Sequence, residues 1–277
     1  MVLSAVLFSA LLHAAWNLMV KASPDKGLDL ALVAAAGALP ALVVLPVLGV
    51  PAPESWPYAV ASGTIHVGYY ALVGAAYRAG DMSYVYPLMR GTPPLLIALA
   101  GGPLIGEHLS AAGWAGVLVI SGGILTLGLS GRGLGAATGR ATAFALANAV
   151  VIAVYSFVDG TGARLSGNPV AYTQTVFLLT AIPVVGGALV RRPAAFASHA
   201  AARWRLGMTG GLCSVAAYAI ALWAMTMAPI ALVSALRETS IVFATALSAL
   251  VLKEKFGVLR HVAAGLIMGG AVVLRLA

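Results

Sequence analysis

Residues 84–96 of the chain read YVYPLMRGTPPLL, and they place Arg90 and the pair Pro93-Pro94 inside one apolar run. The run is long enough to cross a bilayer, because a hydrocarbon core of about 30 Å takes roughly 20 helical residues. An arginine at the centre of a membrane helix costs about 2.5–3.5 kcal/mol. Prolines lack the N–H group that a helix needs. The stretch predicts a membrane helix that is interrupted between Arg90 and Pro94, beside a buried positive charge.

The composition of the whole chain is that of a membrane protein. Of its 277 residues, 61% are hydrophobic and 9% are charged, against roughly 25% charged in an average soluble domain. The apolar residues form blocks of span length, and exposed strands cannot satisfy their backbone in lipid. We therefore predict an all-α membrane protein that lies in the lipid bilayer. The net charge of +8 then reflects cytoplasmic anchoring, and no nucleic-acid partner is expected.

Ten spans are predicted, separated by short loops rich in glycine, proline and charge. They cover residues 2–20, 29–49, 58–77, 82–102, 109–129, 141–159, 169–190, 206–227, 230–252 and 258–275. The N-terminal run has no basic leader segment, so it is interpreted as the first span. The single cysteine, Cys213, excludes an intramolecular disulfide. The short loops leave no room for a soluble domain, so the function is expected within or across the membrane.

The two halves of the chain correspond at an offset of 147 residues. The offset places Arg90 on Arg237, Thr92 on Thr239, Glu107 on Glu254 and the ISGG of 120–123 on the IMGG of 267–270. Five spans thus repeat as five, and an odd number in each half requires opposite orientations in the bilayer. This pattern predicts two inverted five-helix repeats, residues 1–130 and 131–277, which is a frequent architecture of secondary transporters.

The loop charges test the inverted arrangement independently. Odd-numbered loops hold 12 basic residues, whereas the even-numbered loops and the C-terminal end hold 2, Arg164 and Arg275. Basic residues concentrate in cytoplasmic loops. The bias predicts that the odd loops are cytoplasmic and that both termini are non-cytoplasmic.

With these features the chain resembles the EamA-type branch of the drug/metabolite transporter superfamily. The resemblance is carried by ten short-looped spans in two sets of five, the glutamates of IGEHL (105–109) and LKEKF (252–256), glycine pairs in spans five and ten, and MAPIALVSALRE (227–238). Within that branch it is most similar to bacterial exporters of amino acids, especially aromatic ones. The resemblance implies helices around a central cavity, alternating access by rocking of the two halves, and a place in the bacterial plasma membrane. The stretch GDMSYVYPLMRG (80–91) departs from the family pattern by being rich in aromatics, which favours a ligand with a ring.

Three charged residues near span centres are the leading candidates for substrate binding. Arg90 and Arg237 either face a wet cavity, where they would bind an anionic group, or act as structural pins bonded to a glutamate or to free carbonyls. Glu238 adjoins Arg237, but neighbours on a helix point about 100° apart. Glu238 is therefore a candidate partner of Arg90. Two arginines against one glutamate leave a surplus positive charge that a carboxylate ligand would neutralise.

Polar and aromatic side chains on single helix faces extend the candidate site. HAAWN places His13, Trp16 and Asn17 on one face of span one, either toward the cavity or as bonds between helices. A tyrosine-lined pocket would offer ring stacking and cation–π contact with an ammonium group. The remaining candidates are His66, Tyr70, Tyr86, Tyr155 and Tyr218.

The sequence favours a transporter and predicts no enzymatic activity, metal or cofactor. It contains no GxSG, HExxH or glycine-rich phosphate loop. The expected substrate is a neutral amino acid, aromatic ones included, which the carrier exports. The alternatives are another small metabolite, such as a nucleotide sugar, sugar phosphate or drug, and an intramembrane enzyme or lipid-handling scaffold. The particular substrate, the driving ion and the oligomeric state are left open.

Overall fold

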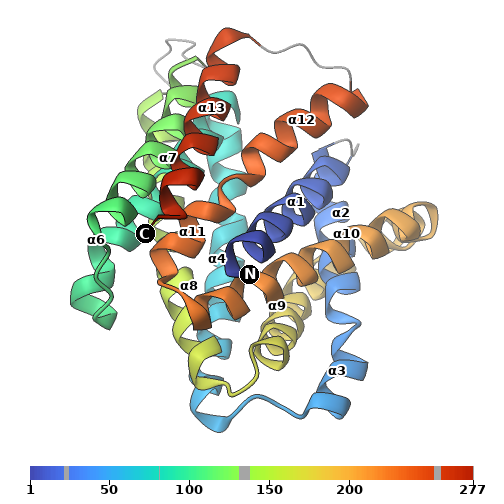
Figure 1. Cartoon of the computed structure of the whole chain (residues 1–277). Coiled ribbons are helices and arrows are strands. Elements are labelled where there is room, and N and C mark those ends of the chain that lie inside the picture. Colours follow the sequence, from blue (N-terminus) through green and yellow to red (C-terminus); the bar gives the residue numbers. More distant parts are fainter. Residues whose placement is uncertain (22–24, 81, 131–137, 253–256, 277) are drawn as a thin grey trace. The chain divides into compact units, whose positions relative to one another are not determined.

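The computed structural model describes residues 1–21, 25–80, 82–130, 138–252 and 257–276 (Figure 1). Within these ranges the chain consists of α-helices and one short 3-10 helix, Pro53–Ser55. The α-helices are α1 (Val2–Lys21), α2 (Lys26–Ala38), α3 (Ala41–Leu48), α4 (Trp56–Ala79), α5 (Met82–Gly91), α6 (Pro93–Ile105), α7 (Ala111–Ser130), α8 (Thr138–Leu165), α9 (Pro169–Arg191), α10 (Pro193–Met227), α11 (Ile230–Arg237), α12 (Ser240–Leu252) and α13 (Val258–Leu274). The all-α prediction is confirmed.

Most helices match the predicted spans to within a few residues, whereas the predicted span 29–49 is divided into α2 and α3, and α8 and α10 are longer than predicted. In the described chain, seven helical segments are long and apolar enough to cross a membrane. They are Val2–Val20, Gly27–Leu48, Tyr84–Ile105, Gly139–Leu165, Pro169–Arg191, Pro193–Met227 and Ile230–Leu247. Two further apolar helices, Ala111–Leu127 and Val258–Leu274, are shorter, and α4 has 24 residues. The chain is therefore a multi-pass membrane protein, and ten crossings remain a prediction.

The chain divides into two compact units, and each draws on both halves of the sequence. The first unit comprises Met1–Leu3, Gly68–Phe157 and Ala228–Ala277. The second unit comprises Ser4–Val67 and Val158–Met227. The helices α1, α4 and α8 contribute residues to both units. The sequence repeats of 1–130 and 131–277 are a different division of the chain, and they remain a prediction.

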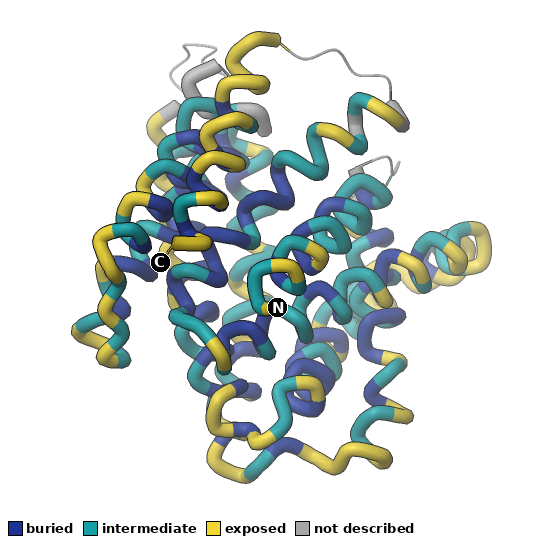
Figure 2. The backbone as a smooth tube through the Cα atoms, viewed as in Figure 1, coloured by how far each residue is buried: buried dark blue, intermediate teal, exposed yellow. Residues whose placement is uncertain are grey.

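In the first unit α7 and α13 pack side by side (Figure 1). Small residues allow this approach, as the glycine pairs in these spans predict. A Cβ atom on Gly270 would lie 2.6 Å from Cγ1 of Ile120 and 3.0 Å from the carbonyl oxygen of Gly116. Ile120 and Ile267 are fully buried, and Figure 2 shows buried stretches on both helices. Close backbone contact replaces the hydrophobic driving force that is absent between helices in lipid.

The second unit is organised by α2, α9 and α10, which pack against one another. The fully buried Asp29 of α2 accepts two hydrogen bonds from the guanidinium of Arg203, both at 3.0 Å, and lies 2.5 Å from Nε2 of His199. Arg203 itself has non-helical backbone angles and bends α10. The sequence interpretation of residues 191–205 as a loop is therefore corrected, because helix α10 begins at Pro193.

Two spans are interrupted at positions that correspond in the sequence offset. Span four breaks at Thr92, between α5 and α6, because Pro93 and Pro94 have no N–H to donate to the carbonyls one turn earlier. Span nine breaks between α11 and α12, where the N–H groups of Glu238 and Thr239 bond three residues back instead of four. The first break is the one predicted. The second has no proline, and the sequence analysis missed it.

Glu107, in the loop that follows α6, binds the start of α11. Its carboxylate Oε2 accepts a hydrogen bond of 2.8 Å from the backbone N–H of Ile230. The first N–H groups of a helix have no partner within the helix, and a negative charge there is favourable. This contact explains the glutamate of the IGEHL motif as a structural group. The corresponding residue of the second half, Glu254, lies outside the described residues.

Candidate functional site

The two helix breaks of the first unit bring Arg90 and Glu238 together. Arg90 lies in the last turn of α5 and Glu238 directly follows α11. The guanidinium engages the carboxylate twice, from Nε to Oε2 at 3.0 Å and from Nη2 to Oε1 at 2.9 Å. Both side chains are at least nine-tenths buried. Two parallel hydrogen bonds between opposite charges form the strongest type of side-chain pair, and the pairing suggested by the sequence is found.

Tyrosines from three helices lie near this ion pair. The ring of Tyr69 of α4 lies edge-on to Tyr70 at 5.3 Å and to Tyr155 of α8 at 6.0 Å, measured between ring centroids. The charges of Arg90 and Glu238 act on the hydroxyl groups of Tyr69, Tyr86 and Tyr155. We call Arg90, Glu238 and these three tyrosines the arginine cluster. Their arrangement provides aromatic walls beside a desolvated pair of charges.

Arg237 and Tyr70 complete the predicted residues of the first unit. Arg237 is half-buried, and its charge acts on the carboxylate of Glu238 and on Tyr155. Tyr70 is connected to the arginine cluster by its ring contact with Tyr69. Six of the predicted residues thus gather in the first unit: Arg90, Glu238, Arg237, Tyr70, Tyr86 and Tyr155. Tyr69 was not among the predicted candidates.

The other five predicted residues lie in the second unit. On α1, Trp16 donates from Nε1 to Nδ1 of His13 at 3.3 Å, and the two rings meet edge to face at 5.3 Å. Asn17 donates to the backbone carbonyl of His13 at 2.7 Å. The expected shared face is present, and these bonds stay within one helix. His66 and Tyr218 also form an edge-to-face ring pair, at 6.1 Å.

Asp159 is a buried acid that the sequence analysis missed. The predicted sixth span ended at this residue, whereas α8 continues to Leu165 and leaves Asp159 fully buried. Its Oδ1 accepts a hydrogen bond from the Tyr172 hydroxyl at 3.0 Å, and its Oδ2 accepts one from the Tyr218 hydroxyl at 2.5 Å. The hydroxyl of Ser62 lies close to this carboxylate. The signal available in the sequence was an aspartate within one turn of an apolar run, with tyrosines in neighbouring spans.

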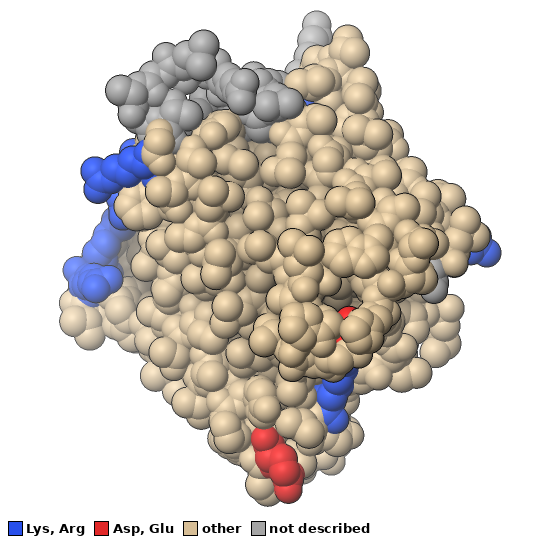
Figure 3. Space-filling model, turned by 90° about the vertical axis from the view of Figure 1, so that its left-hand side faces the viewer, with Lys and Arg blue, Asp and Glu red and all other residues tan. Residues whose placement is uncertain are grey.

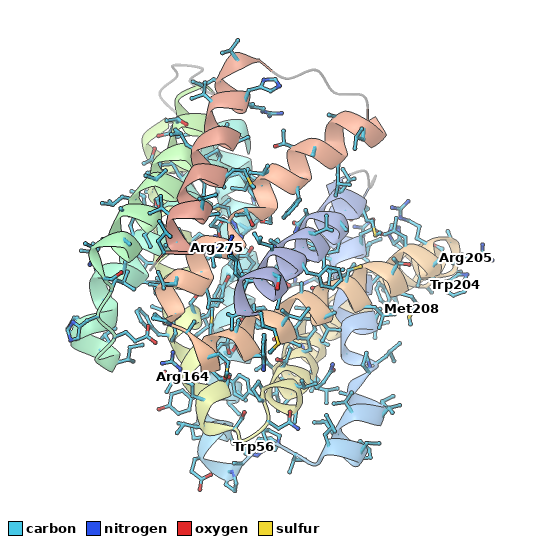
Figure 4. The ribbon with its side chains drawn as sticks, in the orientation of Figure 1. Trp56, Arg164, Trp204, Arg205, Met208 and Arg275 are labelled. Carbon is cyan, nitrogen blue, oxygen red and sulfur yellow. The ribbon has the colours of Figure 1, made fainter. Side chains whose placement is uncertain are left out.

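Two further features of the described surface are a cleft near the end of α6 and the exposed Trp204 on α10. A cleft of about 410 Å³ lies where α6 ends, lined by Leu99, Pro103, His108 and Trp114 among others, and by none of the predicted site residues. Figure 4 shows Trp204, Arg205 and Met208 together on α10, just after its bend. The face in Figure 3 is mostly uncharged, as lipid contact requires. In the part of the chain that the structure describes, no group of three or more His, Cys, Asp or Glu could hold a metal ion.

Comparison with known proteins places these features in context. The model of the EamA-like transporter family matches residues 140–276. No curated protein matches the chain. Among solved structures, one titled only "Crystal structure of protein" has a TM-score of 0.78 and 24% sequence identity, and the match covers 99% of this chain and 98% of the other. At that identity the likeness concerns the fold alone.

Proposed function

Because residues 140–276 match the model of the EamA-like transporter family, we propose that the protein is a secondary transporter that exports neutral amino acids, aromatic ones included, across a bacterial plasma membrane. Membership of this family of typically non-enzymatic transporters suggests secondary transport of a small metabolite. The assignment of an amino acid as the substrate is our own proposal. The observation that carries it is the arginine cluster, in which two interrupted spans present a buried arginine and glutamate among tyrosines.

The chemistry of the arginine cluster suits a zwitterion with a ring. A substrate carboxylate would bind Arg90 or Arg237, and a substrate ammonium would bind Glu238 or a tyrosine face. Tyr69, Tyr86 and Tyr155 supply aromatic surface for the side chain. A diphosphate would need more cations than these two arginines provide. Irregular backbone at membrane depth, as at Thr92 and Glu238, is tolerated where it is buried in protein or lines a cavity.

Binding by such a cluster implies that the Arg90–Glu238 pair opens or is shared when the substrate enters. A charge-assisted hydrogen bond contributes about 1.5–3 kcal/mol, so the substrate must offer each partner an equivalent contact. The carboxylate and ammonium of an amino acid do this at once. The other predicted residues stay proposals for substrate contact. They are Tyr70, which lies beside Tyr69, and five residues of the second unit: His13, Trp16, Asn17, His66 and Tyr218.

Counterflow in proteoliposomes tests this function. Vesicles loaded with unlabelled amino acid should take up labelled L-phenylalanine or L-tyrosine faster than vesicles that contain a sugar phosphate. Tyr86→Phe should weaken apparent affinity, because Tyr86 lies beside the ion pair. The matched control is Tyr84→Phe, since the Tyr84 hydroxyl bonds to Thr142 at 2.9 Å instead. Exchange of a nucleotide sugar, a sugar phosphate or a drug, without any amino acid, would overturn the proposed substrate.

Export also depends on the orientation of the chain, which we propose from the loop charges with both termini non-cytoplasmic. A C-terminal alkaline phosphatase fusion should be active and a C-terminal green fluorescent protein fusion, exported unfolded, should be dark. A bright fluorescent fusion would reverse the orientation without affecting the helical fold.

A further inference from the structure

The second unit contains a buried acid that the proposed substrate site does not use. Asp159 has no exposed surface, and its contacts come from three other helices of this unit. They are Ser62 and His66 on α4, Tyr172 on α9 and Tyr218 on α10. We call Asp159 and these four residues the hydroxyl cluster. An isolated charge this deep in a span is costly and is usually paired or functional.

The partners of Asp159 differ in kind from those of two other buried acids. Glu238 is paired with Arg90, and Asp29 is paired with Arg203. Among the described ion pairs none joins Asp159 to a lysine or arginine. Its hydrogen-bond partners are the hydroxyls of Tyr172 and Tyr218, and the hydroxyl of Ser62 and the imidazole of His66 lie nearby. An arginine partner holds an acid in its ionised form, because it can only donate. A hydroxyl both donates and accepts, so it can satisfy either protonation state of the carboxyl group.

Two residues of α4 near Asp159 could relay a proton to it. Ser62 is fully buried and lies close to Asp159, and its Oγ lies 3.2 Å from Nδ1 of His66. His66 is half-buried, and its Nδ1 also lies 2.9 Å from the carbonyl of Ser62. In the transfer, the imidazolium N–H gives its proton to the Ser62 oxygen while the Ser62 O–H proton passes to the carboxylate. The step leaves neutral imidazole, neutral acid and an unchanged serine.

We propose that the hydroxyl cluster is a proton-binding site, in which Asp159 takes up and releases the proton that drives transport and His66 passes it on through Ser62. The coupling rests on the proposed transport function, whereas the binding of a proton at Asp159 does not. A sodium ion fits less well, because Tyr172 and Tyr218 each direct an O–H donor at the carboxylate, whereas Na⁺ needs a shell of oxygen acceptors.

Infrared pH-difference spectroscopy on the purified protein in lipid tests the proton site without any substrate. Wild type should show a carboxylic acid C=O band that grows as the pH is lowered. The band should be lost in Asp159→Asn, retained in Glu238→Gln and displaced in Tyr218→Phe, which removes one bond but keeps the ring. The absence of a titrating band in wild type, or its persistence in Asp159→Asn, would overturn the proposal.

Proteoliposomes then test the coupling. With equal pH on both sides, Asp159→Asn should still exchange labelled L-phenylalanine, while accumulation driven by a pH gradient should be lost. Tyr84→Phe is the matched control and should retain both. Gradient-driven accumulation by Asp159→Asn at the wild-type level, or accumulation driven by sodium alone, would overturn the coupling. If wild type exchanges no amino acid at all, the proposed function fails, and the infrared titration still decides the proton site.

Discussion

The arginine cluster of the first unit and the hydroxyl cluster of the second both keep a carboxyl group buried, yet they solve the problem in different ways. Glu238 is held by a bidentate guanidinium, with N–O distances of 2.9 and 3.0 Å. Asp159 is held by the hydroxyls of Tyr172 and Tyr218, with the hydroxyl of Ser62 nearby. The first arrangement requires a charged acid. The second accommodates an acid that gains and loses a proton, so burial alone does not reveal the role of an acidic residue.

Breaking the ion pair should have the largest effect. Removing one partner of a buried pair typically costs about 3–5 kcal/mol, because the other charge remains uncompensated. Arg90→Gln and Glu238→Gln should each lower thermal stability in detergent, and the double variant should recover much of it. All three should lose amino-acid exchange. An Arg90→Gln protein with wild-type stability and wild-type exchange would show that the pair serves neither folding nor transport.

Crowding the hydroxyl cluster should have a smaller effect. A Cβ atom on Gly162 would lie 2.5 Å from Cζ of Tyr172, whose hydroxyl holds Asp159. Overpacking of this kind costs about 1–3 kcal/mol, so Gly162→Ala should lower the unfolding temperature and alter the infrared band of Asp159. Gly139→Ala is the control on the same helix, since no atom lies within 4 Å of its Cβ position. If Gly162→Ala and Gly139→Ala had the same unfolding temperature and the same infrared band, Tyr172 would have moved aside without disturbing Asp159.

Neutralising Asp159 should lower the free energy of unfolding less than neutralising Glu238 does. This difference tests most directly whether the two buried acids are held in different ways. Asparagine resembles the protonated acid and keeps an acceptor for one tyrosine. We expect Asp159→Asn to lower the free energy of unfolding by about 0.5–1.5 kcal/mol, the contribution of one hydrogen bond. Chemical or thermal unfolding of Asp159→Asn and Glu238→Gln side by side measures it. A loss as large as that of Glu238→Gln would make the charge of Asp159 structural.

Asp25 provides a partly exposed reference outside the predicted spans. It caps α2 by accepting the N–H of Leu28 at 3.1 Å and pairs with Arg192 at 2.6 Å. The Leu28 bond, followed by Arg192, lowers the pKa of Asp25 below its ordinary value of 3.8. The ionised cap therefore contributes stability above that value, and the contribution is lost as the pH falls through the lowered pKa.

Two substitutions separate the cap from the charge at Asp25. Asp25→Asn keeps the capping oxygen, so the free energy of unfolding should fall by at most about 1 kcal/mol, the contribution of an exposed ion pair. Asp25→Ala removes the cap as well and should lose about 0.5–2 kcal/mol near neutral pH. The difference between Asp25→Ala and wild type should shrink in acid. A difference that grows as the pH falls would contradict the assignment.

Much of the fold follows from local sequence. Apolar blocks of about 20 residues predict membrane helices because the bilayer sets their length, and the observed helices follow the predicted spans closely. Pro93 and Pro94 mark the break at Thr92 because proline cannot donate to the helix. Arg90 and Glu238 were recognisable as partners because isolated charges in apolar spans need one another. In each case the decisive property belongs to a short segment.

Only the tertiary structure decided the rest. The break at Thr239 has no proline, and it lies where Glu238 ends α11 and binds Arg90. Asp159 resembled a residue at a span end, and its hydrogen-bond partners Tyr172 and Tyr218 are supplied by two other helices, with Ser62 of a third nearby. The physical reason is that helix length and interruption depend on neighbours in the chain, whereas the protonation chemistry of a buried acid depends on which distant side chains pack against it.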